Sequence, residues 1–475
     1  MHPPRIAYCS PVNPAPSGIS DYSEELLPFL GQYADLTLFV EPGLRPSNPN
    51  LAAHCEILPL NRLERAQRRR PFDAIVYHMG NSPAHATIWK AAQRVPGVVV
   101  LHDLVLHHFM LWYAANVQRD VQIYVRDMGE RYGEAGAHIA QLMIRSRFTD
   151  AAFAYPCCEP VLDAARLVIG HSAYLCDQVA KLRPKLPVAV VPMGVPLPVL
   201  RERKAARARL GLPAEAVLLA SFGHINAWKR VEPSLRALAV LRAEGYPAYC
   251  VLVGSVSPNY DLAALIQRMG LEQAVTVTGY VPRSQFEDYV AATDLCLNLR
   301  SPTGGETSAS LLRLLGAAKP TLVSAVGAFA ELPAEVAAQV DPGPAEGEQI
   351  LAYCRLLLGR PDVAASLGAN ARAFVARNHT LEQAALAYAR TLAQHYRWPA
   401  LIRHREQPLW AVEEPLPPPA TVPLPATPTH TPVVAPPPPP DPLVLAVARA
   451  AAELGLDEAD PALEPIARQI AELLR

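Results

Sequence analysis

The sequence predicts an α/β protein with two doubly wound parallel sheets, and three observations predict it. Short apolar runs rich in Val, Ile and Leu alternate with helical patterns over the first 410 residues. Most of these runs lack the polar–apolar alternation of a strand with one wet face, so we expect parallel strands covered on both faces. The pattern also starts again near Val217, after the basic helical stretch Arg201–Leu210.

Eleven runs have the length and composition of buried strands, six of them before residue 197 and five after it. They are Arg5–Cys9, Leu36–Val40, Ala74–His78, Val98–His102, Leu167–Gly170, Val188–Pro192, Val217–Phe222, Ala248–Val253, Val275–Thr278, Leu295–Leu297 and Thr321–Ser324. We therefore predict two Rossmann-like domains, residues 1–197 and 198–412, with a helix over Leu381–Ile402. Ligands of such sheets bind beyond the carboxyl ends of the strands, so we expect a site in a cleft between the domains.

The chain changes character after residue 412. Between Pro415 and Pro442, 14 of 28 residues are proline, which favours an extended spacer, and we assign residues 413–442 to a linker. Residues 443–475 show two short amphipathic helical patterns and carry 6 acidic residues against 3 Arg. This tail could dock on a protein partner or pack back on the body as a helical hairpin, and the sequence favours neither.

The composition excludes several classes of protein. The 475 residues include 43 Lys and Arg against 44 Asp and Glu, which argues against a nucleic-acid-binding protein. The chain has no apolar run long enough for a membrane helix and no signal-peptide core, so we expect a cytoplasmic protein. The basic stretch Arg201–Arg209 could attach to the inner face of a membrane, although such stretches are more often solvated helix faces. The 8 Cys are scattered and are expected to be buried free thiols.

Several familiar catalytic motifs are absent from the sequence. It contains no G-x-x-x-x-G-K-[ST] loop, no H-E-x-x-H, no G-x-S-x-G and no D-x-D. These absences disfavour P-loop phosphoryl transfer and zinc peptidase chemistry.

Two loops that follow predicted strands have the features of anion sites. Gly18 lies at a strand-to-helix turn, with Ser20 or Asp21 as the expected N-cap, and helix N-termini favour anions. Lys229 and Arg230 are expected to open the helix after the strand that ends at Phe222. Two cations there oppose the helix dipole, and a bound phosphate would relieve the conflict. An ordinary capped turn and a solvated basic turn are the alternatives.

The segment Ser301–Ser310 is the third candidate loop. Two glycines and several small hydroxyl residues run into an apolar helix, which is typical of a nest of N–H groups for a phosphate. We expect Thr307 and Ser308 to supply such groups. Glu306 would not suit an anion and could instead accept hydrogen bonds from a sugar or ribose hydroxyl. A simple capping arrangement is the alternative.

Histidines cluster after two predicted strands. His78 and His102 each end a strand, where a cleft would begin, and contacts with sugar hydroxyls or phosphate are the favoured interpretation. Purely structural histidines are a second interpretation. A metal site built from His102, Asp103, His107 and His108 is a third and less favoured one, because their spacing matches no fixed cage.

Taken in order, these motifs resemble those of the GT-B-fold retaining glycosyltransferases, family 4-like (glycosyl transferases group 1), over about residues 1–400. Gly18 matches the glycine of the N-terminal loop, and His102 matches the histidine that approaches the transferred sugar. Gly223 through Lys229 resembles the donor-phosphate motif, with Lys229 on its lysine. Tyr280 and Val281 fall in the loop that resembles the nucleobase cradle.

The sequence departs from the family at three positions. His224 stands where the family has a phosphate-binding arginine, and Gly305 and Arg313 stand where it has two glutamates, with Glu306 displaced by one residue. We interpret this as a subgroup variant, because Lys229 and the glycine-rich loops are present. A non-catalytic scaffold or binding protein is one alternative, and a sugar-nucleotide epimerase is another.

The resemblance implies a function as well as a fold. It implies transfer of a sugar from a nucleotide-diphosphate sugar to an unknown glycan, lipid-linked or small-molecule acceptor, with retention and without a metal or other cofactor. It also implies that the helix near the end of the second domain crosses back to the first. The implied residues are His102 and Glu306 for catalysis; Gly18, Lys229, Arg230, Thr307 and Ser308 for the donor phosphates; and His78, Gly223, His224, Tyr280, Val281 and Arg313 for the sugar or nucleotide.

Overall fold

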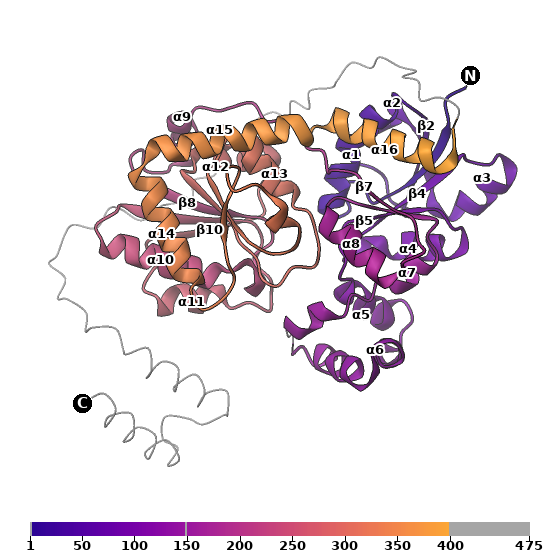
Figure 1. Cartoon of the computed structure of the whole chain (residues 1–475), viewed down its shortest axis with the longest axis horizontal. Helices are drawn as coiled ribbons and strands as arrows, with labels where there is room; N and C mark the ends of the chain where they lie inside the picture. The colour runs from indigo at the N-terminus through magenta and orange to yellow at the C-terminus, as the bar shows by residue number, and fades with distance from the viewer. Residues whose placement is uncertain (1, 148–149, 399–475) are drawn as a thin grey trace, which may run out of the picture. The chain divides into compact units, whose positions relative to one another are not determined.

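A computed structural model describes residues 2–147 and 150–398 of the chain, which lie within one compact unit. Two parallel β-sheets, each flanked by helices, build this unit (Figure 1). The proline-rich linker 413–442 and the tail 443–475 lie outside the described residues, so the predictions made for them stay predictions.

The first sheet has seven parallel strands in the order β3-β2-β1-β4-β5-β6-β7. Its strands are β1 (Arg5–Cys9), β2 (Asp35–Val40), β3 (Glu56–Pro59), β4 (Ala74–Met79), β5 (Val98–Leu101), β6 (Leu167–Gly170) and β7 (Val188–Val190). In β1, Ile6 and Tyr8 belong to the core on one face, while Ala7 and Cys9 belong to the core on the other. Apolar residues on both faces explain why this strand shows no polar–apolar alternation.

The second sheet has six parallel strands in the order β10-β9-β8-β11-β12-β13. They are β8 (Val217–Phe222), β9 (Ala248–Val253), β10 (Val275–Gly279), β11 (Leu295–Asn298), β12 (Thr321–Ser324) and β13 (Ala338–Val340). All eleven predicted strands are confirmed, each within two residues at either end. The sequence analysis missed β3 and β13, which are edge strands, short and poor in large apolar residues.

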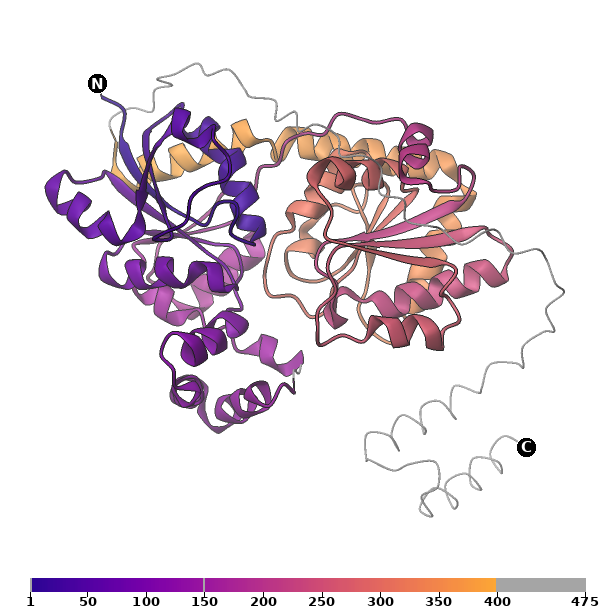
Figure 2. The same cartoon turned by 180° about the vertical axis from the view of Figure 1, so that it is seen from behind.

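The helices before residue 200 cover both faces of the first sheet. They are α1 (Gly18–Leu30), α2 (Leu51–His54), α3 (Leu63–Arg69), α4 (Ala86–Arg94), α5 (His107–Asn116), α6 (Val121–Ile144), α7 (Glu159–Asp163) and α8 (Ala173–Leu182), with the 3₁₀ turns η1 (Leu60–Arg62), η2 (Pro83–His85) and η3 (Asp150–Ala154). Figures 1 and 2 show α5 and α6 packed together as a small lobe beside the sheet.

The second sheet is flanked in the same way. Its helices are α9 (Arg203–Leu210), α10 (Val231–Ala243), α11 (Leu262–Arg268), α12 (Arg283–Ala292), α13 (Ala309–Gly316), α14 (Glu346–Gly359) and α15 (Pro361–Asn378), with the 3₁₀ turns η4 (Ala227–Lys229) and η5 (Gly327–Glu331). Figure 1 shows α10 and α14 side by side, and they pack against β9 and β13 respectively.

The last described helix, α16 (Leu381–Tyr396), lies against the first domain rather than the second (Figure 2). A capping box at Thr380 fixes its start. The Tyr22 hydroxyl of α1 donates to the Tyr388 hydroxyl at 3.2 Å, and the Val195 amide donates to the His379 carbonyl at 2.8 Å. The helix predicted over Leu381–Ile402 is present, but its predicted end was wrong, because the helix ends at Tyr396 and Arg397 takes the left-handed conformation (φ 56°) after it.

Four arginines of the basic stretch Arg201–Arg209 are paired with carboxylates of the second domain. Arg201 and Arg209 both bind the carboxylate of Asp288, and Arg203 and Arg207 both bind that of Asp294. Arg207 is only 1% exposed, so the stretch is not a simple solvated helix face. Lys204 of the same stretch is exposed, and attachment to a membrane stays a prediction.

Two further expectations concerned membrane-spanning helices and the state of the cysteines. Within residues 2–147 and 150–398, none of the helices combines the length and the apolar character that crossing a bilayer demands. The expectation for the cysteines is confirmed, since all eight are buried free thiols.

Candidate functional site

A cavity of about 2870 Å³ opens at the carboxyl ends of both sheets. Loops that follow β1, β4 and β5 line it on one side, and loops that follow β8, β9, β10 and β11 line it on the other. Carboxyl ends of parallel strands are where α/β proteins bind ligands. The volume exceeds the roughly 300–1,000 Å³ of a usual small-molecule site, which leaves room for two substrates.

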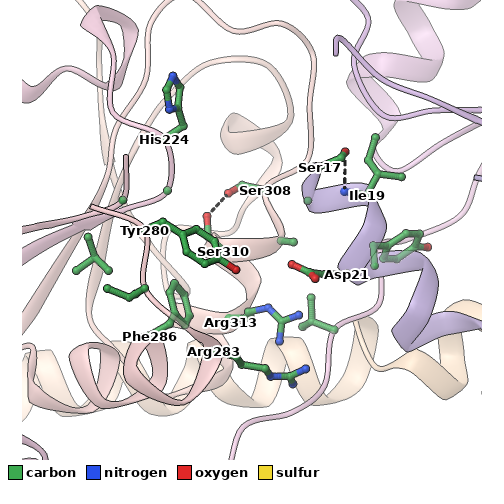
Figure 3. A pocket seen from close by; sticks show the side chains of 18 of the residues that line it. Ser17, Ile19, Asp21, His224, Tyr280, Arg283, Phe286, Ser308, Ser310 and Arg313 are labelled. Atoms are coloured by element: carbon green, nitrogen blue, oxygen red, sulfur yellow. Dashed lines mark hydrogen bonds between the residues drawn. The ribbon is translucent and has the colours of Figure 1, made fainter. Parts of the chain in front are cut away.

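Two helix N-termini reach this cavity from opposite walls, those of α1 and α13 (Figure 3). The Ser17 hydroxyl caps α1 by accepting from the Ile19 amide at 3.2 Å, and the Ser308 hydroxyl caps α13 by accepting from the Leu311 amide at 3.2 Å. Free N–H groups in the first turn of a helix favour an anion. The N-cap predicted for α1, Ser20 or Asp21, was wrong, because Ser17 takes that position and Gly18 begins the helix.

Lys229 lies in the cavity wall at the end of η4. Its ammonium donates to the Phe222 carbonyl at 3.3 Å. Burial, and then the neighbouring Arg300 charge, lower the pKa of Lys229 to about 7. Two buried cations that lie close together are the arrangement that an anionic ligand would stabilise.

Arg230 is not among the residues that line the cavity, and its role in binding the donor phosphates stays a prediction. It adopts the left-handed conformation (φ 52°) at the N-cap of α10, which begins at Val231, so neither Lys229 nor Arg230 opens that helix. The Arg230 Nε donates to buried Glu346 at 2.9 Å. This ion pair ties α10 to α14, and it keeps the guanidinium away from the cavity.

Arg300 is a candidate site residue that the sequence analysis missed. It follows β11, lines the cavity and is 9% exposed. Its guanidinium lies 4.4 Å from the centre of the Phe329 ring and donates to the Glu306 carboxylate. Its position could have indicated a site residue, because it is a charged residue two positions after a buried parallel strand.

Glu306 is held on both carboxylate oxygens. One accepts from Arg300, and the other accepts from the Thr303 hydroxyl at 2.9 Å. Burial favours the protonated acid, but the charge and hydrogen bond of Arg300 outweigh it and lower the pKa of Glu306. Glu306 therefore stays ionised in the cavity wall beside two cations.

The loop that carries Glu306 is attached to the first domain. The Gly304 carbonyl accepts from the Leu104 and Val105 amides at 2.8 and 3.0 Å. Gly305 has φ 80°, and a Cβ on it would lie 2.6 Å from the Leu104 Cβ. Only glycine fits this conformation and spacing, which explains why the carboxylate stands at 306 rather than at 305.

His102 lines the cavity, whereas His78 is fully buried and is not among the lining residues, so its contact with a ligand stays a prediction. The His78 Nδ1 and His102 Nε2 are 2.9 Å apart and share a hydrogen bond. His171 packs beside His102 with ring centres 4.8 Å apart. Burial, and then neighbouring histidine charges, lower the pKa values of His78 and His102, so both rings are neutral near pH 7.

Arg313 lines the cavity, but its guanidinium is paired. It donates to both carboxylate oxygens of Glu25 at 2.7 Å, and Arg283 donates to the same carboxylate at 2.7 Å. Figure 3 shows Arg313 and Arg283 side by side, with Asp21 on the facing helix. Arg313, which stands where the resembling family has a glutamate, is thus held by a carboxylate of the first domain.

The remaining predicted residues lie on the wall of the second domain. Tyr280 is 86% exposed beside Val281, and His224 is exposed with its Nδ1 3.0 Å from the Ser255 hydroxyl. Gly223 and Thr307 also line the cavity. Of the thirteen predicted site residues, the structure brings eleven together in this cavity and leaves out His78 and Arg230.

The less favoured metal site has no supporting geometry among residues 2–147 and 150–398. No three His, Cys, Asp or Glu side chains gather there in a way that could hold a metal ion. His107, one of the proposed ligands, shares a 2.6 Å hydrogen bond with the Tyr124 hydroxyl, away from the cavity wall.

Comparisons with known proteins agree with this geometry. Residues 202–374 match the family model described as glycosyl transferases group 1. A curated relative from Thermobispora bispora, described as a D-inositol 3-phosphate glycosyltransferase, is 30% identical over 151 residues. That match covers 29% of this chain and 35% of the relative, so the chain matches about a third of the relative's length.

Solved structures match over a longer part of the chain. Sucrose-phosphate synthase from Thermosynechococcus elongatus has 18% identity and a TM-score of 0.59, and the match covers 83% of this chain and 99% of that one. HepE from Anabaena, solved with UDP and glucose, has 16% identity and a TM-score of 0.58 and covers 82% and 100%. At these identities the likeness concerns the fold. The chain therefore has the GT-B fold of two Rossmann-like domains, and its residues 202–374 are similar to the family glycosyl transferases group 1.

Proposed function

We propose that the chain is a glycosyltransferase that moves a sugar from a nucleotide-diphosphate sugar to an acceptor. One observation carries the proposal: the cavity gathers Lys229, Arg300 and the N-termini of α1 and α13, all of which favour an anion. A diphosphate is the anion that a group 1 domain of this fold suggests. The Anabaena neighbour was solved with UDP, which makes UDP the first nucleotide to test.

The proposed reaction has four parts. The bond between the anomeric carbon and the phosphate oxygen breaks, and its electron pair leaves on the nucleoside diphosphate. Lys229, Arg300 and the amides of Thr307 and Ser308 stabilise that charge. The acceptor oxygen bonds to the anomeric carbon from the same face, which retains the configuration, and its proton passes to the departing phosphate oxygen. Glu306 and His102 orient the sugar.

Metal independence belongs to the same proposal. Two cationic side chains and two helix N-termini occupy the wall where a divalent ion would otherwise neutralise the leaving group. We therefore expect turnover to survive EDTA. Loss of turnover in EDTA, restored by Mg²⁺ or Mn²⁺, would contradict this part alone.

The test begins with titration calorimetry of UDP and other nucleoside diphosphates, followed by their release from sugar nucleotides. We expect Lys229→Ala to lower kcat/KM by a factor of about 100 to 1,000, the cost of removing one such donor. Lys185→Ala, an exposed lysine outside the cavity wall, is the matched control. Absence of nucleotide binding by the wild type, or equal activity of both variants, would contradict the proposal.

The same assay separates the alternatives. Conversion of one sugar nucleotide into another without an acceptor would indicate an epimerase. Nucleotide binding without any turnover would indicate a scaffold.

A further inference from the structure

The two walls of the cavity differ in charge. Among the described residues that line it, every Lys and Arg comes from the second domain, whose wall also carries the carboxylates of Glu202, Glu287 and Glu306. These cations are Arg201, Arg209, Lys229, Arg283, Arg300, Arg313 and Lys319. The described lining of the first domain has none, and it carries five carboxylates: Asp21, Glu24, Glu25, Asp103 and Asp150. Arg201 and Arg209 pair with Asp288, and Arg283 and Arg313 pair with Glu25. Lys229 and Arg300 therefore attract a donor diphosphate to the second wall, whereas a second anion on the first wall would find carboxylates and no Lys or Arg of that domain.

A compact polar group lies on the first wall after β4 and β5. The Asp103 Oδ2 accepts from the Asn81 amide at 2.8 Å, and the His85 Nε2 is buried without a hydrogen-bond partner. A Cβ on Gly80 would lie 2.5 Å from the Ile19 Cδ1, 3.0 Å from the His85 Nε2 and 3.1 Å from the Asp103 Oδ2, so the two polar atoms lie close together beside the Ile19 methyl group. His85 is fully buried and belongs to the cavity lining, so its unpartnered nitrogen lies behind the partly exposed Asp103 and Asn81.

The neighbouring side chains suit a hydroxyl rather than an ion. The Ser82 hydroxyl is also buried without a partner, and the Asn81 Nδ2 lies 3.1 Å from the His108 Nδ1. Burial, and then the charge of Glu306, raise the pKa of Asp103 to about 7. Buried groups of this kind are stabilised by a ligand that both donates and accepts hydrogen bonds, as a hydroxyl does.

An aromatic patch continues this wall toward the donor site. Trp228 packs edge-on against Phe153 and His108, with ring centres 5.2 and 5.8 Å away, and its indole donates to Asp150 at 2.9 Å. Trp228 directly precedes Lys229, so the patch adjoins the proposed diphosphate site. Apolar ring faces with hydrogen-bonding groups around them match the surface of a sugar or polyol ring.

We propose that Asp103, His85 and Asn81 form the acceptor subsite, and that the acceptor is an uncharged sugar or polyol that binds through its hydroxyl groups. This inference rests on the proposed function and deepens it by naming the class of the acceptor. A phosphate or carboxylate on the acceptor would place an unpaired charge beside Asp103, which is costly in a buried site.

The first experiment uses the full-length wild-type chain with a donor that it binds. Matched acceptor pairs are glucose with glucose 6-phosphate, galactose with galacturonate, and myo-inositol with an inositol monophosphate. Release of nucleoside diphosphate above background hydrolysis and the mass of the product give the rate for each. We expect transfer to at least one neutral compound, at least tenfold faster than to its anionic partner. An equal or faster rate with the anionic partner, or transfer to no neutral compound, overturns the inference.

The second experiment tests the residues. Asp103→Asn should raise the acceptor KM at least tenfold and reduce the preference for the neutral partner, while the affinity for the nucleotide stays within twofold. His85→Gln should raise the acceptor KM as well and provides a second variant if the first does not fold. Asp177→Asn makes the same charge change at an exposed position on α8 and is the control. An unchanged preference in a folded Asp103→Asn protein overturns the assignment.

These outcomes are separable from failure of the proposed function. If no nucleotide binds and no donor is cleaved, the proposed function itself fails. If the donor is bound and cleaved but the anionic acceptors react at least as well, only the acceptor class fails.

Discussion

Arg313 of α13 donates two hydrogen bonds of 2.7 Å to the carboxylate of Glu25 on α1, and this pair joins the two Rossmann-like domains. Both side chains are largely buried, with 19% and 11% exposed. Arg283 shares the carboxylate from α12. Because Arg313 and Glu25 also line the cavity, the contact between the domains and the candidate site are built from the same residues.

A double-mutant cycle should therefore detect coupling between Glu25→Gln and Arg313→Gln. We expect a coupling free energy of about 0.5–3 kcal/mol, because the pair is shielded from solvent. It is obtained from the free energies of unfolding of the four proteins, measured by urea or thermal unfolding. Arg360 and Asp362, an ion pair on the surface, provide a comparison cycle that should give no more than about 1 kcal/mol. Equal coupling in both cycles would contradict a structural role for the pair.

The second prediction concerns Lys229 and protons. Its pKa is lowered to about 7 in the empty cavity, first by burial and then by Arg300. A bound diphosphate favours the charged form and raises that pKa, so binding at pH 8 should take up close to one proton, and binding at pH 6 far less. Titrations of UDP in buffers of different ionisation enthalpy measure this number. Lys229→Met should abolish the proton uptake. Proton release by the wild type would contradict the prediction that the ligand raises the pKa of Lys229.

The third prediction separates the structural and the functional parts of the Arg300–Glu306 pair. Arg300→Met leaves the Glu306 carboxylate without its cation, so we expect both stability and kcat/KM to fall, the latter about 100-fold or more. Adding Glu306→Gln removes the unpaired charge and should restore the melting temperature without restoring activity. Recovery of both properties would mean that Arg300 only supports the loop.

The fourth prediction concerns acid stability. Burial lowers the pKa of His171 to about 4, so between about pH 6.5 and 4 the unfolded chain binds a proton that the folded chain does not. Stability must then fall as the pH falls through this window, by up to about 1.4 kcal/mol per pH unit for each such histidine.

The check compares urea unfolding at several pH values. His171→Asn keeps a donor for the Val191 carbonyl, which His171 Nδ1 contacts at 2.8 Å, but it cannot titrate. Between pH 4 and 6.5 we expect the free energy of unfolding of this variant to change less steeply with pH than that of the wild type. The difference in slope is up to about 1.4 kcal/mol per pH unit, which corresponds to one proton. His138→Asn, at an exposed position of α6, should keep the wild-type slope. Equal slopes for the wild type and His171→Asn would refute the prediction.

Much of the architecture was predictable because it depends on local pattern. The run Val98–Leu101 is apolar on both faces, and this alone predicts a central parallel strand. β13 (Ala338–Val340) carries a glutamine in three residues, and only its pairing with β12 makes it a strand. Gly18, Lys229 and Ser308 were predictable site residues, since glycines, cations and N-caps after parallel strands lie near the carboxyl edge of a sheet.

The sequence by itself determined two parallel sheets, their strands and the loops that reach the cavity, because burial on both faces and capping act between neighbouring residues. Only the tertiary structure decided which cations face that cavity. Arg230 pairs with Glu346, 116 residues away, whereas Arg300 is held by Glu306 and the Phe329 ring. For Arg230 the fold brings a buried carboxylate from a distant segment within hydrogen-bonding reach. For Arg300 the carboxylate is only six positions away, and it is the ring of Phe329 that the fold supplies.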